Sequence, residues 1–194
     1  ERENSEAVFE TIGFRIYQIK GASAFQAFRY RFPWLIATIA SGVLCALMSS
    51  RFENVLASSL ILSFFLTLVL GLGESVSMQS MTVTIQALRV QHPTFKWFSR
   101  EIIKEFGTAI LLGLASGAAV AVSVLIWKQN IKAALVIGGS LVFTLTAACL
   151  IGLAIPTTLH ALKLDPKVSA GPLTLGIADI ITILTYLTFA SVIL

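Results

Sequence analysis

Five apolar stretches, each bounded by charged residues, constrain this chain more than any other feature of its sequence. They cover residues 34–50, 55–73, 106–127, 133–159 and 168–194. A helix needs roughly 20 mostly apolar residues to cross the hydrocarbon core of a bilayer, and all five stretches approach or exceed that length. The pattern predicts an all-α membrane protein, a bundle of five transmembrane helices.

The overall composition fits the same environment. Of the 194 residues, 56% are hydrophobic and only 12% are charged, whereas charged residues make up about 25% of a typical soluble domain. The formal net charge of +4 is small, and the basic residues lie beside the apolar stretches, where anionic lipid headgroups attract them. We therefore expect membrane lipids as partners and no nucleic acid.

The basic residues also predict an orientation, because cytoplasmic loops of membrane proteins carry an excess of Lys and Arg. With a cytoplasmic N-terminus and five crossings, eleven of the fourteen basic residues fall on the inner side. The inner residues are Arg2, Arg15, Lys20, Arg29, Arg31, Arg89, Lys96, Arg100, Lys104, Lys163 and Lys167, and the outer ones are Arg51, Lys128 and Lys132. The sequence thus predicts a multi-pass protein of the cell membrane with its N-terminus in the cytoplasm.

The segment before the first apolar stretch has a pattern of its own. Apolar residues recur there at helical spacing, at Phe9, Ile12, Ile16 and Ile19. This spacing predicts an amphipathic helix at the cytoplasmic membrane surface, and a solvated tail that docks on the bundle is the alternative. We therefore divide the chain into an amphipathic segment, residues 1–31, and a transmembrane domain, residues 32–194.

Asp179 is the single formal charge in the last apolar stretch, eleven residues from its start. At a helical rise of about 1.5 Å per residue, it lies roughly 16 Å into the stretch, close to the bilayer midplane. An ionised carboxylate is costly there unless it faces water, an ion or a partner group. Because none of the five stretches contains Lys, Arg or His, a cation from solution can balance the charge. A protonated Asp179 that shares a hydrogen bond with a neighbouring helix is the alternative.

The pair Gly171-Pro172 stands eight residues before Asp179. Proline removes a helical hydrogen bond, so we expect the pair to interrupt the last helix and to release backbone carbonyls between Gly171 and Leu175. Such carbonyls and the Asp179 side chain can point into one conduit. A proline kink that serves only helix packing is the alternative.

A second polar cluster follows the second apolar stretch, where residues 75–88 could continue the helix in a more polar, partly water-facing form. Its seven oxygen-bearing residues are Glu74, Ser75, Ser77, Gln79, Ser80, Thr82 and Thr84. Helical spacing puts Ser75, Gln79 and Thr82 near one face. Glu74 and Gln79 are the stronger candidates for a functional role, whereas Ser77, Ser80 and Thr84 fit the ordinary polar end of a helix that leaves the bilayer.

Both clusters offer oxygen ligands without Cys or His, a set that suits hard cations such as Mg²⁺ and Ca²⁺. Mg²⁺ is favoured, because it dehydrates reluctantly and usually keeps several waters. Cys45 and Cys149 lie in apolar stretches and are expected to be small buried hydrophobes. No nucleophile with an adjacent base and no phosphate-binding loop is present, so the sequence favours transport over an enzyme.

Several short motifs together resemble the MgtE-type magnesium transporters and their eukaryotic solute-carrier relatives. The resemblance covers most of residues 30–194. Its motifs are Tyr30-Arg31-Phe32-Pro33-Trp34-Leu35, Ser50-Arg51-Phe52-Glu53-Asn54, Gln79-Ser80, Lys104-Glu105, and the segment from Asp165-Pro166 through Asp179 to Tyr186. Each motif alone is weak, and their combination is specific.

The resemblance implies a homodimer of five-helix protomers whose ion path runs along the interface. The Asp179 carboxylates of both subunits would lie at a central Mg²⁺ site, joined by backbone oxygen near Leu175. Gln79 and Thr82 match positions that line the same path. Glu105 matches an acidic position at the cytoplasmic end of the third span, a candidate for a secondary metal site or a gate contact.

The chain also departs from the family pattern. Ser75 and Met78 stand where Asn is usual, Gly171 replaces another polar position, and Glu74 adds a charge. The candidate metal ligands are Asp179, Glu74, Gln79, Thr82 and the backbone carbonyls of Leu175 and Gly171, while Ser75, Met78 and Pro172 are the candidate pore-lining residues.

Three functions stay open from the sequence. The first is transport of divalent cations, most of all Mg²⁺, through a pore at a homodimer interface. The second is a Na⁺- or H⁺-coupled Mg²⁺ exporter or exchanger, which the extra carboxylate of Glu74 favours. The third is a non-transporting membrane scaffold whose polar residues only pack helices.

Overall fold

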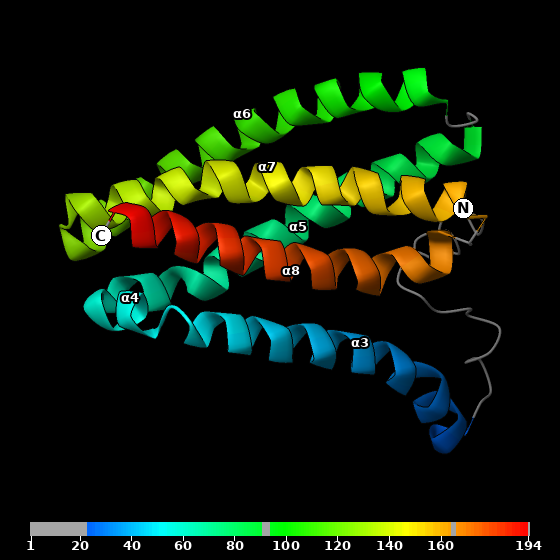
Figure 1. Cartoon of the computed structure of the whole chain (residues 1–194), viewed down its shortest axis with the longest axis horizontal. Coiled ribbons are helices and arrows are strands. Elements are labelled where there is room, and N and C mark those ends of the chain that lie inside the picture. Colours follow the sequence, from blue (N-terminus) through cyan, green and yellow to red (C-terminus); the bar gives the residue numbers. More distant parts are fainter. Residues whose placement is uncertain (1–22, 91–93, 164–165, 194) are drawn as a thin grey trace.

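The computed structural model describes residues 23–90, 94–163 and 166–193, and the regular elements in these ranges are all α-helices. Figure 1 shows them running lengthwise beside one another. In chain order they are α3 (Ala24–Ser50), α4 (Glu53–Ser58), α5 (Leu60–Val90), α6 (Phe95–Lys128), α7 (Ile131–Ala161) and α8 (Pro166–Ile193). The predicted helical membrane bundle is confirmed at this level.

Four helices are long and apolar enough to cross a bilayer, over Leu60–Val90, Lys96–Lys128, Ile131–Ala161 and Gly171–Ile193. A fifth apolar segment, Leu35–Ser50 within α3, is shorter. Each of the five apolar stretches found in the sequence is therefore helical over most of its length, although the first is the shortest.

α3 begins at Ala24 because Ser23 and Gln26 cap it reciprocally. The Ser23 hydroxyl accepts from the Gln26 backbone N–H at 3.4 Å, and the Gln26 side chain accepts from the Ser23 N–H at 3.1 Å, which is a capping box. The helix therefore runs across residues 31–32, where we placed the domain boundary. The amphipathic helix predicted in residues 1–31 lies mostly outside the described residues and stays a prediction.

The second apolar stretch differs from its predicted form. Ser59, with φ −142° and ψ 88°, separates the six-residue α4 from α5, and α5 then continues without a break to Val90. Glu74 therefore lies in the middle of a long helix, which includes the polar continuation expected over residues 75–88. The hydroxyl groups of this part are satisfied within the helix, since Thr82 donates to the Met78 carbonyl and Thr84 to the Ser80 carbonyl, both at 2.8 Å.

α8 also differs from its predicted form, because it is one helix from Pro166 to Ile193 with Pro172 inside it. The expected interruption at Gly171-Pro172 is absent from this helix. A proline removes a single N–H donor, here the one that the carbonyl of residue 168 would use. The rest of the hydrogen-bond ladder stays intact, so neither Gly171 nor Leu175 is released from helical structure.

α7 occupies the centre of the bundle. It packs against α5, α6 and α8, while α3 packs along α8 and α6 lies on the far side of α7 (Figure 1). Small residues permit the closest approach, since a Cβ atom added to Gly113 of α6 would lie 2.7 Å from the Cα of Val142 in α7. Such contacts are the usual means of packing helices in membranes.

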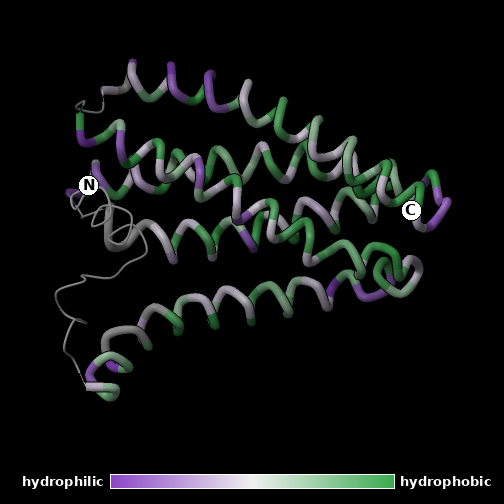
Figure 2. Tube along the Cα trace, turned by 180° about the vertical axis from the view of Figure 1, so that it is seen from behind, coloured by the Kyte–Doolittle hydropathy of each residue, from purple (hydrophilic) through white to green (hydrophobic). Residues whose placement is uncertain are grey.

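The two ends of the bundle differ in charge. α3, α6 and α8 begin at the end where α5 and α7 finish (Figure 1), and Figure 2 shows hydrophilic residues gathered toward the helix ends. Among the described basic residues, that end carries Arg29, Arg89, Lys96, Arg100, Lys104 and Lys163, and the opposite end carries Arg51, Lys128 and Lys132. The fold thus keeps the charge asymmetry on which the predicted orientation rests.

Candidate functional site

Asp179 lies on α8 between two tight helix contacts. One turn before it, Gly176 packs against Ser41 of α3, and an added Cβ atom would lie 3.1 Å from the Ser41 Cβ. One turn after it, Thr182 packs against Gly73 of α5, where an added Cβ atom would lie 2.6 Å from the Thr182 Oγ1. Because residues three apart share a side of a helix, the half-buried Asp179 faces the flank of α8 between α3 and α5.

Glu74 brings a second carboxylate to this flank. It follows Gly73 directly on α5, its side chain is exposed, and its charge lies within electrostatic reach of Asp179. The buried thiol of Cys45 on α3 is also within reach of Asp179. Among the described residues the one ion pair is between Lys104 and Glu101, so no basic side chain neutralises the two carboxylates. A divalent cation would relieve their repulsion.

α5 has two distinct faces at this level. Val76, Ser77, Ser80 and Met81 are buried in the bundle, whereas Ser75 and Gln79 are exposed and Met78 and Thr82 are half-buried. Residues 75, 78, 79 and 82 share one side of a helix. An exposed polar stripe in the middle of an apolar helix is tolerated in a membrane where it lines a water-filled cavity or meets a partner.

The side-chain bonds on this stripe determine which atoms can bind a cation. The Gln79 amide nitrogen donates to the Ser75 hydroxyl at 3.3 Å, so the amide oxygen is the atom suited to a cation. The Thr82 hydroxyl donates to the Met78 carbonyl at 2.8 Å and keeps lone pairs for a further contact.

The predicted backbone ligands lie inside α8. Leu175 and Pro172 are half-buried and Gly171 is buried. In a continuous helix, the carbonyls of Gly171 and Leu175 point at the N–H groups four residues later. Each can therefore offer a cation only its second lone pair.

Glu105 lies away from Asp179, in a polar contact of α5, α6 and α7. Its Oε2 accepts from the Ser80 hydroxyl at 3.0 Å and from the Cys149 thiol at 3.3 Å. The Ser80 hydroxyl also reaches the Cys149 carbonyl at 2.9 Å. The sequence reading missed both partners of Glu105, because residues 25 and 44 positions away leave no local signal.

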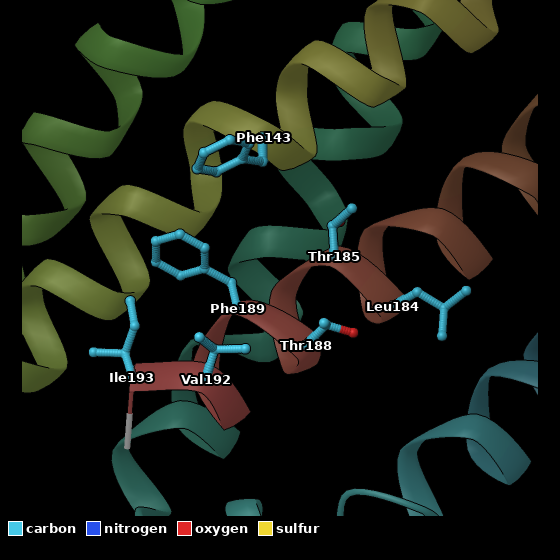
Figure 3. Close-up of a pocket in the computed structure, with 7 residues that line it drawn as sticks. All are labelled: Phe143, Leu184, Thr185, Thr188, Phe189, Val192 and Ile193. Atoms are coloured by element: carbon cyan, nitrogen blue, oxygen red, sulfur yellow. The ribbon is translucent and has the colours of Figure 1, made fainter.

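A separate groove lies between α7 and α8, with a volume of about 470 Å³ (Figure 3). It is lined by Phe143, Leu184, Thr185, Thr188, Phe189, Val192 and Ile193. Its walls are apolar apart from two threonine hydroxyls, and one of these, Thr185, is already 3.2 Å from the Thr144 hydroxyl. Without a carboxylate or an amide, the groove does not suit a cation.

Comparison with known proteins identifies the family that the chain resembles. The family model described as MgtE, a divalent cation transporter, matches residues 66–189, a range that contains Glu74, Glu105 and Asp179. The chain is similar to the magnesium transporter MgtE of Bacillus subtilis, with 33% identity over 168 residues. It is also similar to the proteins of the same name from Thermus thermophilus, with 31% identity over 179 residues, and Enterococcus faecalis, with 30% over 161 residues.

These matches cover 87%, 92% and 83% of this chain, but 37%, 39% and 36% of the respective relatives. The chain thus spans less than two fifths of the length of the curated relatives that it matches. The family model alone covers well over half of the chain, including most of α5 and most of α8. The chain belongs to the MgtE family of divalent cation transporters.

Proposed function

We propose that this chain conducts divalent cations, Mg²⁺ above all, through a pore at a homodimer interface, with Asp179 as the central ligand. One observation carries the proposal. Asp179 and Glu74 stand within electrostatic reach of each other on two helices able to cross a bilayer, and no described basic residue pairs with either. Two carboxylates in that position need a cation.

The available ligands favour Mg²⁺. They are carboxylate, amide, hydroxyl and carbonyl oxygens, from Asp179, Glu74, Gln79, Thr82, Leu175 and Gly171. Mg²⁺ keeps much of its water shell and binds through one or two carboxylates, so this sparse set suits a partly hydrated ion. The names of the three relatives, all magnesium transporters, support the same choice.

The exposed face of the site supports a dimer. Among the described residues, no group of three or more Asp, Glu, His or Cys side chains could hold a metal ion, and Glu74, Ser75 and Gln79 are exposed on the surface of the protomer, where a second copy can cover them. A second copy would double the carboxylates and enclose the stripe formed by Ser75, Met78, Gln79 and Thr82 together with Pro172. With the basic end in the cytoplasm, the membrane potential would drive Mg²⁺ inward by about 4.6 kcal/mol at 100 mV.

Proteoliposomes with an internal Mg²⁺ indicator test this proposal. Asp179→Asn keeps the shape of the side chain and removes its charge, and we expect it to abolish Mg²⁺ flux. The matched control is Thr188→Val, on the same helix but in the wall of the apolar groove, and it should carry flux like the unmutated chain. Unchanged flux in Asp179→Asn would refute the assignment, and an unmutated chain without flux or Mg²⁺ binding would favour a scaffold.

The proximity of Glu74 and Asp179 favours one second function, a Na⁺- or H⁺-coupled Mg²⁺ exporter or exchanger. Two adjacent carboxylates can alternate between a proton, a monovalent cation and Mg²⁺. An imposed Na⁺ or proton gradient would then drive Mg²⁺ uphill in the same vesicles, and Glu74→Gln would abolish the coupling. Flux that follows only the Mg²⁺ gradient and the membrane potential would exclude this function.

A further inference from the structure

Among the described residues, the outer helix α6 forms a side-chain hydrogen bond to the proposed ion-path helix α5 only through Glu105. At the opposite end of these helices, Trp127 and Lys128 of α6 contact the Phe64 ring of α5, and Trp127 also contacts Phe65. α6 packs chiefly against α7, and among the described residues the side-chain hydrogen bonds from α6 to other helices both end on Glu105. We infer that Glu105 is a positioning residue, which holds α5 in the rotation that turns Gln79 and Thr82 toward the ion path. This inference rests on the function proposed above.

The contact is a closed triangle of three helices. The single hydroxyl proton of Ser80 on α5 is shared between the Oε2 of Glu105, at 3.0 Å, and the carbonyl of Cys149 on α7, at 2.9 Å. The same Oε2 also accepts from the Cys149 thiol at 3.3 Å. Ser80 is 4% exposed and Cys149 is 2% exposed. These bonds join α5 to α6 and α7 at one level, so they oppose rotation of α5 about its axis.

α5 and α7 are also in close contact at the same level. Gly152 of α7 faces the Ser77 carbonyl, and a Cβ atom added there would lie 2.8 Å from the Cβ of Ser80. The segment 77–81 of α5 is therefore held by the backbone of α7 and, through Ser80, by the carboxylate of α6. These contacts come from two different helices, so they restrain α5 from two sides.

The order of residues along α5 links the bond at Ser80 to the directions of Gln79 and Thr82. Gln79 precedes Ser80 by one residue, and Thr82 follows it by two, while the buried Ser77 and Thr84 share the inner side with Ser80. Successive residues in a helix differ by about 100° in direction. Once the direction of Ser80 is set by Glu105, the directions of Gln79 and Thr82 are set as well.

The same bonds occupy one oxygen of Glu105. Both donors, a hydroxyl and a thiol, converge on Oε2, while Oε1 accepts from neither of them. The two roles open to this carboxylate, acceptor of hydrogen bonds and ligand of a cation, differ in which side chain can replace it. A carboxylate that acts by accepting a hydrogen bond can be replaced by an amide, whereas a carboxylate that acts by its charge cannot.

Flux through the intact chain in proteoliposomes separates these roles. We expect Ser80→Ala and Glu105→Ala each to lower Mg²⁺ flux by about tenfold. The double variant should lose no more flux than the worse single variant, because both substitutions remove the same bond, between Ser80 and Glu105. Glu105→Gln should stay within about twofold of the unmutated chain, since its amide oxygen still accepts from Ser80. Glu101→Gln, one turn away and paired with Lys104, is the matched control and should be unchanged.

Two results would overturn the inference. One is a double variant whose loss equals the product of the single losses. The other is a Mg²⁺ flux that falls as far in Glu105→Gln as in Glu105→Ala while Ser80→Ala keeps normal flux. That combination would indicate that Glu105 acts by its charge, as an ion ligand does. If an alanine variant loses its helical content, the comparison uses Glu105→Gln and Ser80→Thr instead. These keep the acceptor oxygen and the donor hydroxyl of the bond.

A spectroscopic measurement keeps this inference apart from the proposed function. In a Cys45→Ala background, the infrared S–H stretching band reports Cys149 alone, and we expect Glu105→Ala to shift it to higher frequency as the thiol loses its acceptor. An unshifted band would overturn the inference whatever the flux. An unmutated chain without flux would overturn the proposed function, while the band would still report the contact.

Discussion

Tyr186 of α8 donates its hydroxyl proton to the backbone carbonyl of Leu62 in α5, across 3.0 Å and 124 residues of sequence. Both residues are completely buried. The bond joins α8 near its end to α5 near its beginning. Asp179 lies in the middle of α8, and Glu74 lies in the middle of α5. It therefore fixes how far α8 can slide along α5, and with it the relative height of the two carboxylates.

Tyr186→Phe removes this bond and little else. We expect a loss of about 1 kcal/mol in stability, because the Leu62 carbonyl keeps its helical partner and only one net hydrogen bond is lost. Thermal unfolding in detergent, followed by circular dichroism, measures the change. Thr188→Val on the exposed side of α8 is the control. An equal loss of stability in that variant would show that the loss in Tyr186→Phe does not come from the bond to Leu62.

Gly73→Ala adds a methyl group where α5 and α8 touch. The added Cβ atom would lie 2.6 Å from the Thr182 Oγ1, so the helices must separate beside Asp179 and Glu74. We expect a loss of about 1–3 kcal/mol in stability, the usual range for overpacking, and reduced Mg²⁺ flux.

The chain offers both a control and a rescue for Gly73→Ala. Gly71, on the same helix, has nothing within 4 Å of an added Cβ atom, so Gly71→Ala should leave the stability unchanged or raise it slightly. Thr182→Ala removes the clashing atoms and should restore much of the loss in the Gly73→Ala background. Failure of the rescue would mean that the contact of Gly73 with Thr182 does not determine the spacing of the helices.

Mg²⁺ should stabilise the folded chain, because a ligand that binds only the native state raises its stability. At 100 times the dissociation constant the gain is about 2.7 kcal/mol, seen as a rise in the unfolding midpoint that EDTA reverses. We expect Asp179→Asn to eliminate this rise, and Thr188→Val to retain it. Equal rises in all three proteins would place the binding site elsewhere.

Glu74→Gln should change stability in opposite directions with and without divalent cations. Without them, the substitution removes the repulsion between Glu74 and Asp179 and should raise the unfolding midpoint. With Mg²⁺ present, the loss of one carboxylate should weaken binding and shrink the Mg²⁺-dependent rise. Glu53→Gln in the exposed α4 is the control, and a shift of the same sign in both conditions would contradict a shared site.

Sequence reasoning located the helices well and their ends less well. The apolar stretches 106–127 and 133–159 lie within α6 and α7, because apolar length is a local property that a bilayer requires of any crossing helix. The continuation of α5 past Glu74 agrees with the more polar helix expected over residues 75–88, whereas the continuity of α8 through Pro172 was not predicted. In an apolar medium an unpaired backbone group is costly, so a helix tolerates a polar residue or a proline sooner than it stops.

The sequence by itself determined that this chain is a helical membrane protein that resembles the MgtE family and that Asp179 is the single formal charge of its last apolar stretch. Composition and motifs carry that information without any knowledge of neighbours. Only the tertiary structure decided which side chains meet, Gly73 with Thr182 and Ser80 with Glu105 and Cys149, and it brought Glu74 within electrostatic reach of Asp179. These pairs depend on the rotation and height of packed helices, which are set by contacts between residues far apart in the chain.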